Sequence, residues 1–274
     1  MTASAANGHG EATGIGGYDP AFFQKLERVE DRHFWFRARR RAVGTILRQL
    51  AAKFPPGFKA LELGCGNGGM LRLMQQSCPD GRVFGMDLFA EGLLNARRRV
   101  KAPLVQADVR HPPFSENLHL IGMFDVLEHL DDDSAILRHV RSMLVPGGAL
   151  VLTVPAHMAL WSYFDEAANH ARRYAGQELR RCLRGNGFTV EYQTQFMSTI
   201  YPLVWLGRKV NYHVHVGRSR KAKSRLREMT ENDLRILPVI NGLLDWSLAG
   251  EESLIRHRRR ITRGTSILAV ARRT

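Results

Sequence analysis

Cysteine is scarce in this sequence, and the spacing of the few that occur argues against two classes of protein. Only three cysteines are present in 274 residues, Cys65, Cys78 and Cys182. They form neither the closely spaced pairs of a zinc site nor the even-numbered framework of a disulfide-rich domain. We therefore expect a protein of a reducing, cytoplasmic compartment.

Long apolar runs are missing as well. A membrane-spanning helix needs roughly 20 apolar residues, and the apolar stretch from Ile236 to Gly250 is shorter and contains Pro238 and Asp245. Residues 1–17 are small and polar and lack the basic start and apolar centre of a secretory signal. We expect residues 1–17 to form a disordered tail and any membrane contact to be peripheral.

Acidic residues are outnumbered by basic ones. The chain carries 40 lysine and arginine residues against 26 aspartate and glutamate residues, which gives a formal net charge of +14. Such an excess is typical of proteins that bind nucleic acid, an anionic membrane surface or an acidic substrate. It is equally compatible with arginine-rich faces that contact only water.

The most informative stretch is rich in glycine and runs from Lys59 to Met70. Apolar residues lead into Glu62, and a crowded turn follows. The glycines of this turn are Gly64, Gly66, Gly68 and Gly69. Glycine permits positive φ angles and a close approach of the backbone to a ligand, which the N–H groups of the following helix would face. The pattern predicts a strand, a tight turn and a helix start that bind a nucleotide-like molecule.

Two nucleotide patterns overlap in this stretch. Gly64-x-Gly66-x-x-Gly69, with Asp87 farther along the chain, satisfies the dinucleotide fingerprint of NAD-dependent enzymes. Glu62-x-Gly64-x-Gly66-x-Gly68 instead resembles the first motif of class I S-adenosylmethionine-dependent methyltransferases. The glycines alone do not decide between the two.

Strand and helix patterns alternate around this turn. Strands are predicted over residues 58–63, 83–86, 104–107, 118–123 and 149–154, and helices over 68–77, 90–100 and 133–144. This alternation implies an α/β, Rossmann-like fold with a parallel sheet covered by helices on both faces. Residues 188–196 and 266–270 are expected to add an antiparallel hairpin, so the predicted sheet is mostly parallel and seven-stranded.

Acidic residues follow four successive predicted strands, namely Glu62, Asp87, Asp108 and Asp125. Ligands of such sheets bind beyond the carboxyl ends of the strands. This order favours the methyltransferase over the NAD-dependent enzyme. The stretches that together resemble class I methyltransferases are 60–70, 84–87, 106–109 and 144–152, in a resemblance that covers about half of the chain.

The resemblance implies S-adenosylmethionine as cofactor and S-adenosylhomocysteine as product. Because ribose hydroxyls are donors, the carboxylate of Asp87 can accept from both. An aromatic and basic segment ahead of the first strand resembles the helices that close the pocket in many of these enzymes. The cofactor-binding residues implied in this way are Trp35, Arg40, Glu62, Gly64, Cys65, Gly66, Asn67, Gly68, Asp87, Leu88, Asp108, Val109 and Asp125.

Asp125, Glu128 and His129 have a spacing that would place them on one side of a helical turn at the mouth of the site. Three interpretations are open: the residues border the cofactor, His129 removes a substrate proton, or all three bind a divalent metal. Similar runs bind metal in ubiquinone-pathway O-methyltransferases and in methyltransferases of RNA 3′ ends. Here an aspartate replaces their usual first glutamate and shortens the reach, so a metal is not the favoured interpretation.

Two more histidines, His157 and His170, follow the fifth predicted strand, where the acceptor side of the pocket is expected. Aromatic and charged residues surround both in the sequence. We expect one of them to orient or deprotonate an acceptor hydroxyl. With His129, they are the candidate catalytic residues.

The predicted divisions of the chain are a tail (1–17), an N-terminal helical lid (18–56), the cofactor-binding core (57–196), a basic helical insertion (197–263) and a final core strand (264–274). The insertion combines basic residues with aromatic and aliphatic ones. This combination is typical of an interfacial helix and would also suit a phosphate-linked lipid.

The later part of the chain, residues 154–174 and 264–272, resembles a bacterial branch associated with glycan, lipid and secondary-metabolite pathways. We therefore expect O-methylation of a small-molecule, sugar or lipid-linked acceptor in a biosynthetic pathway. The alternatives are N- or C-methylation of a secondary metabolite, an RNA methyltransferase that uses the basic insertion, and an NAD-dependent oxidoreductase. RNA is less favoured as a partner than an anionic membrane surface, because no RNA-binding module is recognisable.

Overall fold

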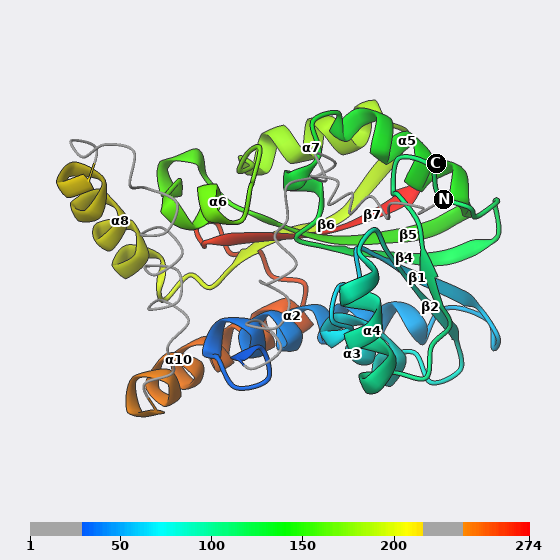
Figure 1. Ribbon diagram of the computed structural model, residues 1–274, viewed down its shortest axis with the longest axis horizontal. Helices are drawn as coiled ribbons and strands as arrows, with labels where there is room; N and C mark the ends of the chain where they lie inside the picture. Colours follow the sequence, from blue (N-terminus) through cyan, green and yellow to red (C-terminus); the bar gives the residue numbers. More distant parts are fainter. Residues whose placement is uncertain (1–28, 216–237) are drawn as a thin grey trace, which may run out of the picture.

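The computed structural model describes residues 29–215 and 238–274 (Figure 1). Three predictions lie wholly or partly outside the described residues: the disordered tail, the first part of the lid up to residue 28, and the basic stretch of residues 216–237. Within the described ranges, no helix is long and apolar enough to cross a membrane.

Within these same ranges, seven strands form one sheet in the order β3-β2-β1-β4-β5-β7-β6. Strands β1 to β5 pair in parallel, and β7 lies antiparallel between β5 and β6. Both the predicted mostly parallel, Rossmann-like sheet and its closing hairpin are confirmed. The bounds are β1 Lys59–Leu63, β2 Arg82–Asp87, β3 Leu104–Gln106, β4 Leu118–Phe124, β5 Leu144–Pro155, β6 Phe188–Phe196 and β7 Ser266–Arg273.

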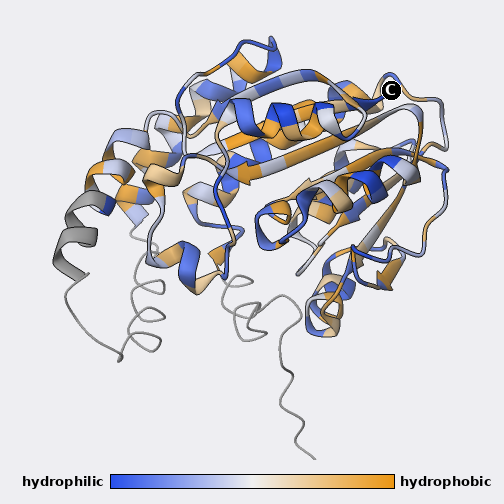
Figure 2. Cartoon of the chain, turned by 90° about the horizontal axis from the view of Figure 1, so that it is seen from above, coloured by the Kyte–Doolittle hydropathy of each residue, from blue (hydrophilic) through white to orange (hydrophobic). Residues whose placement is uncertain are grey.

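Helices cover both faces of the sheet (Figure 1). One face carries α2 (Phe34–Ala51), α3 (Gly69–Ser77) and α4 (Ala90–Arg99), and the other carries α5 (Asp133–Met143) and α7 (Gly176–Gly185). Figure 2 shows that the strands between these layers are largely apolar, whereas the helices alternate between apolar and hydrophilic residues. The continuous apolar strands therefore form the centre of both cores, as expected for a sheet buried on both faces.

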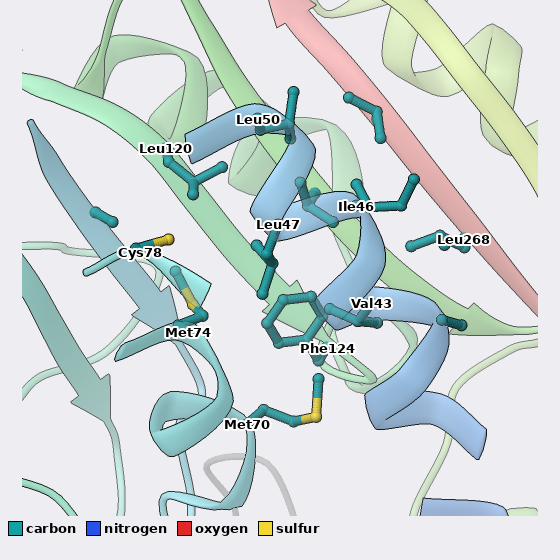
Figure 3. Packing of buried hydrophobic residues seen from close by; sticks show 14 of the residues in the cluster. Val43, Ile46, Leu47, Leu50, Met70, Met74, Cys78, Leu120, Phe124 and Leu268 are labelled. Atoms are coloured by element: carbon teal, nitrogen blue, oxygen red, sulfur yellow. The ribbon is translucent and has the colours of Figure 1, made fainter. Parts of the chain in front are cut away.

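The helix predicted to act only as a lid is also a core element. Val43, Ile46, Leu47 and Leu50 of α2 are fully buried, and their spacing places them along one side of the helix. Figure 3 shows these side chains among residues of the sheet and α3. The partners labelled there include Met70, Met74, Leu120, Phe124 and Leu268. The C-terminal half of α2 is thus fixed to the sheet, which sets the position of its N-terminal half.

Most predicted strand ends are within one residue of the observed ones, but β7 continues three residues beyond its predicted end and β5 begins five residues before its predicted start. The predicted fifth strand began at Ala149, after a stop at Pro146-Gly147-Gly148, but β5 begins at Leu144. Its pairing with β4 shifts register between Leu118 and Leu120, which pair with Leu144 and Ala149. Helix α5 ends before the Pro-Gly-Gly segment, as expected. The segment itself lies within β5, at the point where the pairing with β4 is irregular.

In its described residues, the segment between β6 and β7 forms the helices α8 (Tyr201–His215) and α10 (Pro238–Arg256). Helix α10 runs alongside α2 in the same direction. The N–H of Phe34 donates to Asn241 at 2.8 Å, and Arg41 pairs with Asp245 at 2.8 Å. The predicted insertion is therefore attached to the predicted lid.

A single buried carboxylate joins α10 to the end of β6. Glu251 is 7% exposed and accepts hydrogen bonds from the backbone N–H groups of Met197 at 2.6 Å, Ser198 at 2.7 Å and Thr199 at 3.3 Å. The hydroxyl of Ser198 donates to it as well, at 2.7 Å. Glu251 thus satisfies the donors of the turn that follows β6.

Replacing Glu251 by alanine is expected to lower the free energy of unfolding by about 3 kcal/mol, because several buried donors lose a charged acceptor at once. Urea denaturation followed by circular dichroism measures this loss. The neighbouring Glu252 is a matched control, since its carboxylate pairs with the exposed Arg256 at 3.1 Å. Glu252→Ala should cost less than about 1 kcal/mol, and equal losses in the two variants would contradict the role given to Glu251.

Candidate functional site

A cavity of about 970 Å³ lies beyond the C-terminal ends of the parallel strands. It is lined by the turn after β1, by the residues that follow β2, β3 and β4, and by the end of β5. Helices α2 and α8 contribute further lining residues. This is the edge at which ligands bind in open α/β sheets.

The glycine turn lines this cavity with Gly64, Cys65, Gly66 and Asn67. Gly64 and Gly66 have φ angles of +72° and +47°. A Cβ atom on Gly64 would lie 2.5 Å from Cγ2 of Val126. Only glycine therefore allows the turn to follow this path, and the backbone itself forms the cavity wall.

Asp87 stands at the end of β2 and links the glycine turn to the next helix. Its carboxylate accepts from the N–H of Gly66 at 2.7 Å and from the N–H of Phe89 at 2.9 Å. Burial raises the pKa of Asp87 above its ordinary value, although these two donors act in the opposite direction. Each oxygen keeps a lone pair that can accept from a ligand in the cavity.

The residues expected beside adenine also line the cavity, namely Leu88, Asp108 and Val109. The carboxylate of Asp108 already accepts from the backbone N–H of Arg110 at 2.9 Å and from its guanidinium Nε at 2.9 Å. The side-chain hydrogen bonds of Arg110 hold the pKa of Asp108 below its usual range. Asp108 is thus in place and ionised, but much of its acceptor capacity is used.

Three of the predicted cofactor residues do not line the cavity. Arg40 points to the outer side of α2, where it binds Asp31 at 3.0 Å. Glu62 is 2% exposed and lies beneath the glycine turn, and Gly68 is the N-cap of α3. Trp35 lines the cavity as expected.

Arg39, which the sequence reasoning missed, lines the cavity in place of Arg40. Its guanidinium pairs with the carboxylate of Asp125, which also accepts from the hydroxyl of Thr153 at 2.9 Å. Arg39 precedes Val43 by four residues and so continues the buried side of α2. That register was the signal available in the sequence.

The predicted helical turn of Asp125, Glu128 and His129 takes a different form. Asp125 precedes the helix with a φ of +55°, and only Leu127–His129 form a short 3-10 helix. All three predicted side chains still line the cavity. Asp125, however, is directed to Arg39, so it does not join Glu128 and His129 in one cluster.

His170 takes the place expected of Asp125. The ligand atoms of Glu128, His129 and His170 lie within 4.8 Å of one another. Glu128 is fully buried, neither of its oxygens has a hydrogen-bond partner among the described residues, and burial raises its pKa well above the ordinary value. Burial and the neighbouring His170 lower the pKa of His129 to about 4, so its imidazole is neutral near pH 7.

A buried aspartate fixes the orientation of His170. Nδ1 of His170 lies 2.9 Å from the carboxylate of Asp165, which is fully buried and also accepts from Arg173 at 2.7 Å. Burial alone would raise the pKa of Asp165, but the hydrogen bond of His170 and the charge of Arg173 hold it below its ordinary value. The ionised Asp165 therefore favours the His170 tautomer that carries its proton on Nδ1.

His157 is not among the lining residues of the cavity, contrary to the expectation that it faces the acceptor. Its Nε2 lies 2.7 Å from Oε1 of Gln195, and its ring contacts Tyr201 edge to face. A φ of +60° turns the chain at this residue, which directs the side chain toward β6.

Comparison with known proteins agrees with this geometry. Residues 35–193 match the family model described as a methyltransferase domain, which is more than half of the chain. The chain belongs to the class I S-adenosylmethionine-dependent methyltransferase family. This membership confirms the resemblance drawn from the motifs and decides against an NAD-dependent oxidoreductase.

Two curated relatives illustrate the similarity. A trans-aconitate 2-methyltransferase of Azoarcus is 31% identical over 129 residues, which are 46% of this chain and 49% of the relative. A protein of Mycolicibacterium smegmatis named as an S-adenosylmethionine-dependent methyltransferase is 27% identical over 171 residues, 60% of this chain and 62% of the relative. The chain thus spans only about half to three fifths of the length of these relatives.

Solved structures of methyltransferases share the fold. One is a Haloferax volcanii complex of the Trm112 methyltransferase activator with a methyltransferase, with a TM-score of 0.57 and 20% identity over 92% of this chain and 94% of that one. Another is the phosphoethanolamine N-methyltransferase 2 of Haemonchus contortus with S-adenosylhomocysteine, with a TM-score of 0.56 and 16% identity over 93% of this chain and 57% of that one.

Replacing Gly64 by alanine is expected to lower the free energy of unfolding by about 3 kcal/mol, because a positive φ and a clash with Val126 both oppose the side chain. Gly57 is the matched control, since it has a φ of +78° and nothing within 4 Å of an added Cβ. Gly57→Ala should cost only about 1 kcal/mol. Equal urea midpoints would contradict the close packing inferred for the turn.

Proposed function

We propose that the protein transfers a methyl group from S-adenosylmethionine to an oxygen atom of a small acceptor. The observation that carries this proposal is the position of His170, which Asp165 orients in the same cavity that Asp87 and the glycine turn enter. The proton of a hydroxyl acceptor has to be removed, and an oriented imidazole is the usual general base for this step.

The side chains present fit the cofactor that the family implies. Asp87 would hold the ribose hydroxyls, and Leu88 and Val109 would border the adenine. Arg39 and Asp125 form an ion pair at the opposite side of the glycine turn, and together they offer partners for the carboxylate and the ammonium of the methionine portion. S-adenosylmethionine supplies a methyl group already activated by a sulfonium, so correct positioning can account for much of the rate.

The proposed base acts through Nε2 of His170. With Nδ1 hydrogen-bonded to Asp165, Nε2 carries the free lone pair and lies 4.0 Å from Oε1 of Glu128. Nε2 would accept the proton of an acceptor hydroxyl. Bound S-adenosylmethionine would supply the methyl group, whose bond to sulfur breaks as the bond to oxygen forms and which leaves S-adenosylhomocysteine as the second product. The resulting imidazolium is stabilised by the ionised Asp165, which is itself held by Arg173.

The acceptor side of the cavity favours a molecule with both polar and apolar parts. Its lining there includes Phe36, Phe164 and Val204, beside the cluster of Glu128, His129 and His170. A small molecule, a sugar or a lipid-linked acceptor meets this requirement. The relative named for trans-aconitate suggests a carboxylate oxygen as one form of acceptor. The alternatives to this proposal are N- or C-methylation of a secondary metabolite and methylation of RNA.

The same cluster fits a divalent cation as a second candidate mechanism. Glu128, His129 and His170 are the residues that would hold such a cation, because carboxylate and neutral imidazole are common metal ligands. Its charge would then stabilise a deprotonated acceptor oxygen. Asp125, which the sequence pattern included in this set, forms an ion pair with Arg39 and is not part of this cluster.

Calorimetric titration with S-adenosylhomocysteine tests the cofactor site. Asp87→Ala is expected to weaken binding about 100-fold, because two hydrogen bonds to a charged acceptor contribute about 3 kcal/mol together. The exposed Asp80 provides a control whose alanine variant should bind like the wild type. Binding of NAD in place of S-adenosylhomocysteine would overturn the proposal.

Steady-state kinetics with methyl-labelled S-adenosylmethionine tests the base. The acceptors offered should carry a hydroxyl, a carboxylate, as in trans-aconitate, or an amine. We expect label on oxygen, and with a hydroxyl acceptor we expect His170→Ala to reduce kcat by roughly 10²- to 10⁴-fold while binding of S-adenosylhomocysteine is unchanged. A carboxylate acceptor is already deprotonated and should depend much less on His170. His157→Ala, outside the cavity, is the histidine control and should retain turnover.

Two results would contradict this mechanism. Transfer to nitrogen alone would remove the assignment to oxygen. Turnover that is lost after dialysis against a chelator and restored by Mg²⁺ or Mn²⁺ would assign the cluster of Glu128, His129 and His170 to a cation instead of a base.

A further inference from the structure

Helix α10 has an apolar face that no described residue covers. The exposed fractions are 75% for Val239, 62% for Leu243, 79% for Trp246 and 41% for Leu254. Their spacing of four, three and eight residues places them along one side of the helix. We call this set, with Ile240 at 52% exposure, the outer stripe of α10.

The opposite side of α10 already has its partners. Leu248 and Ile255 are buried, and Leu244 packs against the same core. The acidic residues of the helix face inward too: Asp245 pairs with Arg37 and Arg41, and Glu251 binds the turn after β6. The third acid, Glu252, pairs with Arg256 and contacts Thr45 of α2. The outer stripe therefore carries no acidic group.

Exposed arginines lie at both ends of the stripe. Arg37, beside the N-terminal half of α10, is 46% exposed, and Arg256 at its last turn is 61% exposed. Immediately after the helix follow Arg259, Arg260 and Arg263, all exposed, and no acidic residue lies between Arg256 and the end of the chain. An apolar stripe without acids and with cationic ends is complementary to an anionic lipid surface.

Helix α8 lies at the same end of the molecule as α10 (Figure 1) and carries exposed leucines of its own. Leu203 and Leu206 are 63% and 56% exposed. The same helix contributes Val204, Gly207 and Arg208 to the lining of the cavity. A surface formed by α8 and α10 would thus lie beside the wall of the functional site.

We propose that the outer stripe of α10, with Leu203 and Leu206 of α8 and the arginines that follow α10, binds the surface of an anionic lipid membrane. The helix lies along the interface, with Trp246 and Leu243 entering the headgroup region and the arginines contacting lipid phosphates. RNA fits this surface less well, because four of the five side chains of the stripe are aliphatic and cannot stack on bases or bind phosphates. The inference concerns docking and does not depend on which atom is methylated.

Co-sedimentation of the full chain with vesicles tests the proposal. We expect binding to vesicles of equal parts phosphatidylglycerol and phosphatidylcholine, and much weaker binding to pure phosphatidylcholine. The double variant Leu243→Ser with Trp246→Ser should bind the anionic vesicles at least roughly tenfold more weakly, because both inserted side chains are lost. Replacing Arg259 and Arg260 by glutamate should also reduce binding, most strongly at low salt.

Leu94 on α4 is the matched control for the stripe. It is 62% exposed, as Leu243 is, but lies on another helix. Leu94→Ser should bind vesicles like the wild type, and binding of S-adenosylhomocysteine verifies that every variant is folded.

Two outcomes would overturn the proposal. One is a wild-type protein that does not sediment with anionic vesicles, or a stripe variant that sediments equally well. The other is a wild-type dimer in light scattering that the stripe variant converts to a monomer without any binding to vesicles, which would make the stripe a contact between two copies of the chain. A wild-type protein that binds anionic vesicles but does not bind S-adenosylhomocysteine would refute the proposed function and leave the membrane proposal standing.

Discussion

The packing of one side of α2 against the sheet determines the arrangement of the site and of the segment beside it. Val43, Ile46 and Leu50 are fully buried against the core, so the helix cannot rotate or slide without exposing them. Because the helix is rigid, the same contacts fix Arg39 near Asp125. They also present Arg37 and Arg41 to Asp245, and so position α10. The predicted lid helix is therefore a fixed core helix: its C-terminal half packs in the core, and its N-terminal half lines the cavity.

Local patterns were sufficient to predict the sheet and most of the residues that line the cavity next to β1, β2 and β3. Each strand is a short apolar run, and the acids at or just beyond the ends of β2, β3 and β4 necessarily meet at one edge of a parallel sheet. The signal for the glycine turn is also local. The positive φ of Gly64, and the clash that an added Cβ would make with Val126, restrict this position to glycine. What the prediction did not use was the rotation of α2, although the four-residue spacing of Arg39 and Val43 indicated it. A shift of one residue turns a helical side chain by about 100°, and this separates Arg39 in the cavity from Arg40 outside it.

The acceptor side was predicted less well because it depends on contacts between distant parts of the chain. The prediction grouped Asp125 with Glu128 and His129 by helical spacing, but a positive φ at Asp125 and its ion pair with Arg39 separate it from them. The third member of the cluster is instead His170, which comes much later in the sequence, after β5 and α6. Asp165, five residues earlier, orients that histidine. Its spacing from Ser162 is that of a helix capping box, but this local signal does not indicate the contact with His170.

The distribution of charge reconciles a basic protein with an acidic cavity. The chain has a formal charge of +14, yet the residues that surround the glycine turn and the acceptor side include Glu62, Asp87, Asp125 and Glu128. Burial raises the pKa of Glu62, Asp87 and Glu128, and Arg39 partly offsets this effect at Glu62 and Glu128. Carboxylates in this state gain most from a ligand that is itself cationic, because its charge replaces the solvation that burial has removed. A sulfonium cofactor with an ammonium group meets that requirement. Exposed arginines lie elsewhere, as Arg259, Arg260 and Arg263 do in the segment that follows α10.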